Sequence, residues 1–451
     1  MQRTFLIIAL ILVQWVLAQS TVLAAGTVFV NVNVLPMTSE TVIEQQTVVV
    51  EGGRIVAIGP TDEVPIPENA GLVDGTDRYL MPGLAEMHAH VPGSDSPSLD
   101  RYFSLYVANG VTTIRGMLGM PSHLALRQDL LDGKVFGPRL ITSGPSLNGR
   151  SVNGAGQARQ LVEEQHAAGY DFIKVHPGLD AEEFEALAET ANGLGIPYAG
   201  HVPVAVGVSR ALQLNMASID HLDGYLAALL PANSVGSGGY GGFFDVMLAN
   251  ELETDRIADI ARETALSDTW NVPTEVLVEF RVNETPVSEL RNWPEMRYMP
   301  AATVERWVSD KESVVGAPRF DPEVAARAID IRRRLILEIH RAGGGLLLGS
   351  DSPQVFSVPG FSIHRELDAL VSAGLTPFEA LRTGTVAVDE FLQSNTGIVA
   401  VGRAADLVLL DANPFVDIRN SRRIHGVMVR GQWYSAATLA ARLDPYLNEE
   451  D

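Results

Sequence analysis

Short apolar runs alternate with helical segments through the middle of the sequence, from about residue 83 to residue 351. Since a helix is the usual connection between parallel strands, this alternation is typical of βα units. Eight such units in roughly 300 residues is the size of a TIM-type barrel, whose active sites lie at the carboxyl ends of the strands. Besides the run that holds His88, strands are expected at 111–115, 139–143, 172–176, 197–201, 218–221, 274–278 and 345–350. Helices are predicted at 181–192, 322–341 and 376–382.

The two ends of the chain differ from the middle, because their short β-rich runs are not separated by helices. Strands are expected at 27–34, 42–50 and 54–58, and residues 397–434 have the same character. We therefore predict an α/β protein with a (β/α)8 TIM-type barrel at 83–390. A small β-sandwich would be built from the N-terminal segment, 26–82, and the C-terminal segment, 391–451.

The first 25 residues are typical of a signal peptide. Arg3 gives a positive end, the run from Phe5 to Leu17 is apolar apart from Gln14, and Ala18 and Ala25 are candidate cleavage positions. The alternative is an uncleaved anchor, but the apolar run is short for a membrane span. The absence of cysteine excludes disulfides and Cys ligands. We expect an exported bacterial protein, periplasmic or extracellular, with no stable membrane association once the signal is removed.

The formal net charge of −22 bears on possible partners. The chain offers no Lys/Arg-rich run with which to neutralise phosphates, so nucleic acid is an unexpected partner. A small-molecule substrate is expected instead, and a homo-oligomer stays an open alternative. The segment 234–242, rich in Gly and Ser, is interpreted as a loop tip, with a mobile lid over the barrel as the alternative.

His88 and His90 form the first candidate site. Successive side chains of a strand point to opposite faces, so two residues two apart point to the same side. Neutral imidazoles are common metal ligands, which makes the pair a candidate metal site. A His pair alone is more often a structural feature, so the interpretation depends on further ligands downstream.

Four further residues of metal-binding type follow at the predicted ends of strands: Lys174, His201, His221 and Asp351. Singly, the Lys could pair with an acid, each His could be a core residue, and Asp351 could cap a helix. Together with His88 and His90 they fall where the strands of one barrel end, which chance does not explain. Nitrogen and carboxylate ligands suit Zn or a similar divalent ion.

The order H-x-H, Lys, His, His, Asp resembles the amidohydrolase superfamily, within it the imidazolonepropionase-related, prolidase-like members. The resemblance includes Met81-Pro-Gly-Leu84 before the His pair and Gly402–Asp411 after the barrel, and runs from about Thr27 to Trp433. It implies two divalent metal ions, with Zn the expected identity. By this resemblance the first ion is held by His88, His90 and Asp351, the second by His201 and His221, and a carboxylated Lys174 bridges them.

Three positions depart from the family pattern. Gly116 stands where an Asp usually follows Arg115, and 386–388 reads Val-Ala-Val where Asn-Pro-Ala is usual. The loop 146–154 lacks the Gly-Gly-His segment of some relatives. This last difference removes a polar contact to substrate, so the substrate class is less constrained than the metal site.

The resemblance implies hydrolysis by a metal-bridging hydroxide, with Asp351 as general acid/base. Tyr225 is a candidate for stabilising the oxyanion, and His176 for contacting substrate, with support of Lys174 as the alternative. A carboxylate of the substrate could be bound by Arg115, Asn148 or Arg297, each of which could instead make ordinary surface contacts.

The leading prediction is an amidohydrolase, prolidase- or dipeptidase-like, that cleaves a carbon–nitrogen bond such as an N-acyl or non-classical peptide bond in a small substrate. A lactone or ester hydrolase comes next, since the same nucleophile attacks any carbonyl. A ring deaminase is less expected, because the deaminases usually carry a Glu at the position of Val204. A non-catalytic periplasmic binding protein is least expected, because the ligand set is complete.

Overall fold

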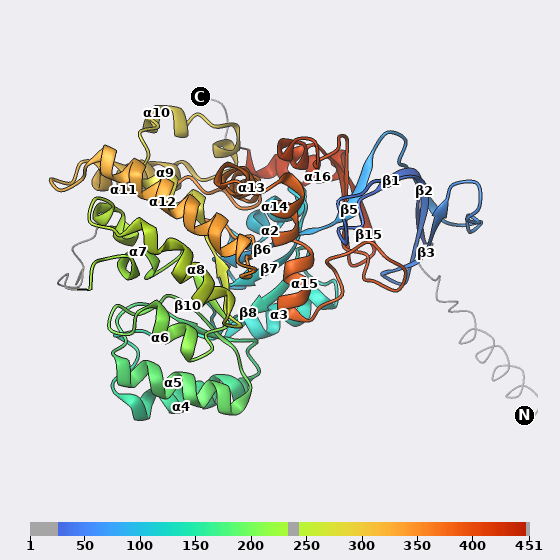
Figure 1. The fold of residues 1–451 in the computed structure, drawn as a ribbon. Helices are drawn as coiled ribbons and strands as arrows, with labels where there is room; N and C mark the ends of the chain where they lie inside the picture. The colour runs from blue at the N-terminus through green and yellow to red at the C-terminus, as the bar shows by residue number, and fades with distance from the viewer. Residues whose placement is uncertain (1–25, 233–242, 448–451) are drawn as a thin grey trace, which may run out of the picture.

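The computed structural model describes residues 26–232 and 243–447 (Figure 1). The predicted signal peptide and the segment 234–242 lie outside the described residues. None of the described helices combines the length and the apolar composition that a membrane span requires.

Strands from the two ends of the chain pair in one sheet, on one side of the molecule (Figure 1). They are β1 (Thr27–Val34), β2 (Ile43–Glu51), β3 (Arg54–Pro60), β4 (Gly71–Asp74), β5 (Tyr79–Pro82), β13 (Leu407–Leu410), β14 (Ile424–Val429) and β15 (Gln432–Ser435). Their order is β15-β14-β13-β5-β1-β2-β3, with β4 beside β1. The seam is the antiparallel pair β5 and β13, in which Met81 faces Val408. The predicted pairing of the two ends is therefore observed, whereas the two layers of a sandwich stay a prediction.

The middle of the chain supplies short parallel strands, in the order in which they occur along the chain. They are β6 (Leu84–Ala89), β7 (Val111–Gly116), β8 (Arg139–Thr142), β9 (Ile173–Val175), β10 (Tyr198–Gly200), β11 (Ser218–Asp220) and β12 (Trp270–Val272). They form a three-stranded sheet, β6-β7-β8, and a four-stranded sheet, β12-β11-β10-β9. Every pairing within these two sheets is parallel.

Isolated bridges connect the two parallel sheets. Ser143 pairs with Phe172 between β8 and β9, and Leu346 pairs with Asn271 of β12. The extended segment that begins at Leu346 then reaches β6, where Ser352 pairs with Ala89. The arrangement is TIM-barrel-like, with the segment 346–352 in the place of the eighth predicted strand.

The strand prediction at 274–278 was wrong, and the strand predicted at 345–350 is an extended segment with isolated bridges rather than a regular strand. Residues 274–278 were expected to be a strand because of their apolar β-branched run, but they belong to a helix, α9 (Glu275–Val282). The strand is β12, just upstream. The Glu366 carboxylate accepts hydrogen bonds from the backbone N–H groups of Glu275 and Val276, at 2.9 Å each, and so satisfies the start of the helix.

Helices surround the parallel strands (Figure 1). The longer ones are α2 (Leu99–Ala108), α3 (Ser122–Leu131), α4 (Ala155–Ala168), α5 (Ala181–Leu194), α8 (Ile257–Ala265), α11 (Ala301–Val315), α12 (Pro322–Arg341), α13 (Phe361–Ala373) and α16 (Ala436–Leu443). The shorter ones are α6 (Val208–Gln213), α7 (Tyr225–Ala228), α10 (Val287–Leu290), α14 (Pro377–Thr383), α15 (Val386–Leu392), and the 3₁₀ turns η1 (Phe243–Leu248), η2 (Thr254–Arg256), η3 (Pro294–Tyr298), η4 (Ile418–Arg422) and η5 (Asp444–Tyr446). The three predicted helices are confirmed, and α5 and α14 each begin with a capping box.

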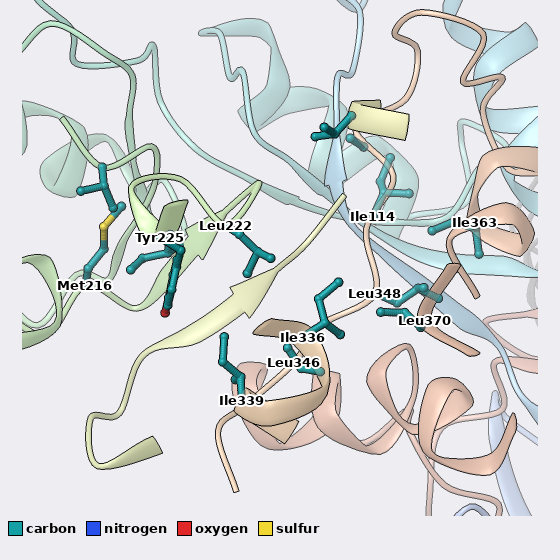
Figure 2. Close-up of a cluster of buried hydrophobic side chains, with 14 of the residues drawn as sticks. Ile114, Met216, Leu222, Tyr225, Ile336, Ile339, Leu346, Leu348, Ile363 and Leu370 are labelled. Carbon is teal, nitrogen blue, oxygen red and sulfur yellow. The ribbon is translucent and has the colours of Figure 1, made fainter. Parts of the chain in front are cut away.

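The largest apolar core lies between the parallel strands and these helices. Figure 2 shows part of it, where Ile336 and Ile339 of α12 lie beside Leu346 and Leu348 of the last extended segment. Leucine and isoleucine side chains fill this interface. The buried histidine and aspartate side chains lie instead at the strand ends.

Candidate metal centre

β6 brings the first two imidazoles to one place, as their spacing predicts. His88 and His90 stack with ring centroids 5.7 Å apart and an interplanar angle of 17°. The Asp351 Oδ1 atom lies 2.8 Å from His90 Nε2 and 3.5 Å from His88 Nε2. The predicted pair and the predicted carboxylate therefore meet, although 261 positions separate Asp351 from His90 in the sequence.

Five imidazoles from four strand ends form a continuous row. The ring centroids lie 4.6 Å apart between His88 and His221, 4.7 Å between His221 and His201, and 5.0 Å between His201 and His176. His90 continues the row beyond His88. The carboxyl ends of parallel strands meet at one edge, which explains why residues so far apart in sequence become neighbours.

Two of these rings are oriented by hydrogen bonds to their Nδ1 atoms. His221 Nδ1 lies 2.7 Å from the Thr274 hydroxyl, and His201 Nδ1 lies 3.0 Å from Asp223 Oδ2. His221 has a φ of 63°, which ends the strand and turns its side chain toward the row. A fixed Nδ1 leaves Nε2 as the ligand atom, the usual arrangement for metal-binding histidines.

Lys174 is fully buried among these residues. Its Nζ lies 3.5 Å from Asp220 Oδ2. Burial lowers the pKa of the Lys174 ammonium, and the charge of Asp220 opposes that shift. The aliphatic part of the side chain passes over Gly200, where a Cβ would lie 2.9 Å from Lys174 Cδ and 2.4 Å from the Val175 carbonyl oxygen. Glycine at 200 therefore lets the lysine reach the site.

Asp220 belongs to the site and was missed in the sequence. It is fully buried, and its Oδ2 atom lies 3.1 Å from His88 Nδ1 in addition to its contact with Lys174. Its Oδ1 atom accepts hydrogen bonds from Ser218, at 3.1 Å, and Arg115, at 3.3 Å. The sequence feature that could have revealed Asp220 is its spacing of two from Ser218 in β11. This spacing places both side chains on the same, inner face of the strand.

Glu86 is a second residue that sequence reasoning missed. It is fully buried and accepts hydrogen bonds from the backbone N–H of His88 at 2.9 Å and of Ser350 at 2.8 Å, and from the Ser350 hydroxyl. Burial raises the pKa of its carboxyl group to about 8. Glu86 thereby holds the backbone next to Asp351 against the strand that carries the His pair.

Burial also sets the charge of the imidazoles. It holds the pKa of His88 and of His221 well below the ordinary value for histidine, so both rings are neutral at neutral pH. Burial opposes ionisation of Asp351, but the surrounding His88, His90 and Lys174 more than offset it, and the net pKa is lowered. Neutral imidazoles beside an ionised carboxylate are the protonation states that a divalent metal ion requires.

Unsatisfied buried atoms provide a test of whether a metal fits. His88 Nδ1 and Asp351 Oδ1 are buried without hydrogen-bond geometry to any partner among the described residues, despite their short distances to neighbouring groups. One ligand atom from each of His88, His221 and Asp351 lies within 4.8 Å of the others. Buried polar atoms without partners are costly, and a cation bound at Asp351 Oδ1 would remove part of that cost. The donor set, imidazole nitrogen with carboxylate oxygen, fits a divalent ion of the zinc type.

Tyr225 does not lie where the predicted oxyanion role requires it. Its side chain is fully buried and its hydroxyl is 3.0 Å from the Thr264 hydroxyl. Figure 2 shows it inside the apolar core beside Met216 and Leu222. The glycine at 224 has a φ of 80° and starts a short helix that turns Tyr225 into the core. We correct this prediction, because the hydroxyl has its partner in the core.

Arg115 is not available to a substrate carboxylate either. The guanidinium is 1% exposed, donates to the Met87 carbonyl at 2.8 Å and pairs with Asp220. The rings of Phe172 and Phe391 lie 5.4 Å and 5.3 Å from its Cζ atom. Arg115 therefore positions Asp220 beside the ligand row. This structural role replaces the predicted role of binding a substrate carboxylate.

The remaining candidates lie at the rim. His176 is half-buried beside His201, and it shares one surface pocket with Asn148. The Asn148 side-chain oxygen already accepts from the backbone N–H groups of Arg150 and Ser151, at 2.9 and 3.2 Å. Arg297 is exposed and lies over the ring of the adjacent Tyr298, with Cζ 5.0 Å from its centroid. The structure brings His176 to the imidazole row, but places Asn148 and Arg297 in contacts of their own segments.

The comparison with known proteins identifies the family. The model of the amidohydrolase family matches residues 257–434. The solved structure of bottromycin amidohydrolase superposes with a TM-score of 0.72 at 25% identity, covering 93% of this chain and 90% of that one. The chain belongs to the amidohydrolase superfamily. The predicted family and enzyme class, a hydrolase acting on carbon–nitrogen bonds, are therefore confirmed.

Other members of the superfamily share the fold or part of the sequence. A Xaa-Pro dipeptidase with bound methionine has a TM-score of 0.64 at 17% identity, over 91% of this chain and 100% of that one. Adenine deaminase 3 of Rhizobium meliloti is 26% identical over 168 residues, which is 34% of this chain. That alignment spans 28% of the deaminase, so the chain matches less than a third of this curated relative. Members of the superfamily use divalent metals, which agrees with the donor set.

Proposed function

We propose that this amidohydrolase cleaves an amide bond, N-acyl or non-classical peptide, in a small substrate at the metal centre. The observation that carries the proposal is the convergence of His88, His221 and Asp351, whose ligand atoms lie within 4.8 Å of one another. His90 joins the same group through its 2.8 Å distance to Asp351. Burying such a cluster of imidazoles around a carboxylate is energetically costly, which favours a functional site over a purely structural core.

Two divalent ions, zinc by preference, would be held by the residues of the row. His88, His90 and Asp351 would hold one, and His201 and His221 the other. Lys174 would lie between them, carboxylated on Nζ, since burial lowers its pKa and so favours the neutral amine that this modification consumes. Bound ions of this kind lower the pKa of a water ligand and polarise a carbonyl group.

The chain's own residues orient these groups and move the proton. Asp351, ionised and with Oδ1 free of hydrogen bonds, accepts the proton of the attacking water and returns it to the leaving nitrogen. Asp223 and Thr274 fix His201 and His221 through their Nδ1 atoms. Asp220, held by Arg115, keeps Lys174 within the ligand row.

Two rival reactions use the same centre. Lactone or ester hydrolysis needs the same groups, and only the leaving atom differs. Ring deamination is supported by the similarity to adenine deaminase 3. Against it, the residue three beyond His201 is Val204, which is 76% exposed and has no acid–base group. We therefore rank amide hydrolysis first.

The place of action and the finer architecture are proposals that rest on the sequence. An N-terminal signal would export the protein to the periplasm or outside a bacterial cell. The parallel strands, joined by the bridges at Phe172, Leu346 and Ser352, would form a closed (β/α)8 barrel. The terminal segments, 26–82 and 391–451, would form the small β-sandwich.

The proposed function is tested by metal analysis and a substrate panel of N-acyl amino acids, dipeptides, lactones and adenine. We expect about two zinc ions per chain and amide cleavage that is lost in Asp351→Asn. Asp259→Asn, an isosteric change of a carboxylate whose side chain is 74% exposed on α8, is the matched control and should keep full activity. Amide cleavage that survives complete chelation, or that Asp351→Asn retains, would refute the mechanism. Adenine deamination without amide cleavage would select the rival function.

A further inference from the structure

Arg281 lies beside the ligand row without contributing to it. It stands on α9, the helix that follows β12. Its Cζ atom lies 4.4 Å from the centroid of the Phe243 ring, which meets Phe244 edge-on at 4.4 Å. Phe244 in turn lies over His221 with ring centroids 4.9 Å apart. Two aromatic rings therefore link this guanidinium to the metal ligands.

The guanidinium is a half-buried cation with an incomplete set of partners. Its Nε atom is buried and has no hydrogen-bond partner among the described residues. The other buried arginines near the site are paired: Arg115 with Asp220 at 3.3 Å, and Arg332 with Glu275 at 2.8 Å. Among the described residues no carboxylate forms an ion pair with Arg281, and a partly desolvated cation without such a partner is energetically costly.

The charge of the proposed metal ligand Asp351 acts on Arg281. Burial lowers the pKa of its guanidinium, while the charges of Asp310 and Asp351 raise it. The geometry agrees, because only the rings of Phe243 and Phe244 stand between the guanidinium and the His221 ring. An anionic group on that molecule would supply the missing partner, and a planar carboxylate matches the fork of a guanidinium.

We propose that Arg281 receives a carboxylate of the substrate, so that the site selects amides with a free carboxylate close to the scissile bond, such as N-acyl amino acids and dipeptides. This inference rests on the proposed function and assigns its substrate class. Arg281 takes the role that the sequence suggested for Arg115, Asn148 or Arg297.

The two phenylalanines form an apolar surface that extends from Arg281 to the metal ligands. Phe244 and Asp245 have positive φ angles, 50° and 59°, which non-glycine residues rarely adopt. This backbone presents the Phe244 ring to His201, with an interplanar angle of 6°, as well as to His221. A substrate that extends from the ligand row to Arg281 would pack its apolar part along these two rings.

The first experiment compares N-acyl amino acids with their C-terminal amides in the zinc-loaded enzyme. Wild type should prefer the free carboxylate by about 10- to 100-fold in kcat/KM, the usual range for a charge-assisted hydrogen bond. Arg281→Gln should remove that preference by lowering kcat/KM for the acid alone, and Arg281→Lys should restore part of it. Equal preference for the acid in wild type and Arg281→Gln would overturn the proposal.

Arg101→Gln is the matched control. Arg101 also has a buried Nε without a partner among the described residues, and its Cζ lies 5.2 Å from the Tyr446 ring, but it stands on α2 against the C-terminal turn. Loss of a comparable cation there should leave the ratio of acid to amide unchanged. A similar fall in this ratio in both variants would show a general effect of removing a buried arginine and would also overturn the proposal.

Calorimetric binding separates this inference from the proposed function. The zinc-loaded protein is titrated with an N-acyl amino acid and with its amide, whether or not either is cleaved. Binding of the acid that is 10- to 100-fold tighter than that of the amide, and is weakened only by Arg281→Gln, supports the carboxylate receptor even if no hydrolysis occurs. Hydrolysis of amides without a difference in binding or in kcat/KM between the acid and its amide would keep the proposed function and refute the role of Arg281.

Discussion

Gly200→Ala tests how Lys174 reaches the site. Gly200 has a φ of 128°, and an alanine Cβ there would lie 2.4 Å from the Val175 carbonyl oxygen and 2.9 and 3.0 Å from Lys174 Cδ and Cε. The backbone oxygen belongs to the neighbouring strand and cannot move without breaking the sheet. The lysine or the strand must therefore shift, and both belong to the ligand row.

The magnitude follows from two contributions. Forcing a non-glycine residue into this backbone conformation costs about 1–3 kcal/mol. Overpacking a closed interior adds about 1–3 kcal/mol. We expect the free energy of unfolding to fall by about 2–6 kcal/mol in total, together with loss of metal from the centre, because Lys174 would be displaced.

The assay combines denaturant unfolding of the metal-free protein with the zinc content of the loaded protein. Gly195→Ala is the matched control, because Gly195 also has a positive φ, 72°, but a Cβ there meets nothing within 4 Å. The control carries the backbone strain without the steric contact and should keep its metal. If Gly200→Ala were no less stable than Gly195→Ala and bound zinc equally well, the reasoning about Lys174 would be wrong.

Three further predictions concern the groups around the imidazoles. Thr274→Val removes the hydroxyl that fixes His221 and should weaken zinc binding by about 10- to 100-fold in a chelator competition, with little change in fold by circular dichroism. Asp223→Ala should have a similar effect through His201, and unchanged zinc affinity in either variant would show that these contacts do not orient the ligands. Burial lowers the pKa of His364 to about 3, so the imidazole stays neutral in the folded protein. In the unfolded chain it takes up a proton below about pH 6.5. The free energy of unfolding of the metal-free protein should therefore fall as the pH drops below about 6.5. His364→Gln should flatten that slope by up to about 1.4 kcal/mol per pH unit, measured by denaturant unfolding at several pH values, and an unchanged slope would contradict the assignment.

The sequence predicted those features that depend on strand periodicity and strand ends. His88 and His90 meet Asp351 because the ends of parallel strands converge, and this convergence is independent of side-chain detail. The misplaced seventh strand had a different cause. The apolar run after Thr274 fits a strand or a buried helix equally well. The helix is favoured by the Glu366 carboxylate, which is distant in sequence and accepts hydrogen bonds from the first N–H groups of the helix.

Side-chain roles were harder to predict than backbone positions. Tyr225 and Arg115 follow or end strands, as site residues do, yet Tyr225 turns into the core at Gly224 and Arg115 pairs with Asp220. Such pairing depends on partners more than a hundred residues away in the sequence. Arg281 was overlooked for the opposite reason, because its distinguishing feature is a buried Nε without a hydrogen-bond partner among the described residues, which a sequence does not display.

The seam between β5 and β13 governs when this protein can acquire its structure. β5 leads directly into the strand that carries the first imidazoles, but its antiparallel partner is synthesised more than 300 residues later. A nascent chain therefore has an unpaired edge beside its ligand strand until nearly the whole polypeptide has emerged from the ribosome. Such a delay keeps the sheet incomplete during synthesis and leaves metal uptake to follow the folding of the whole polypeptide.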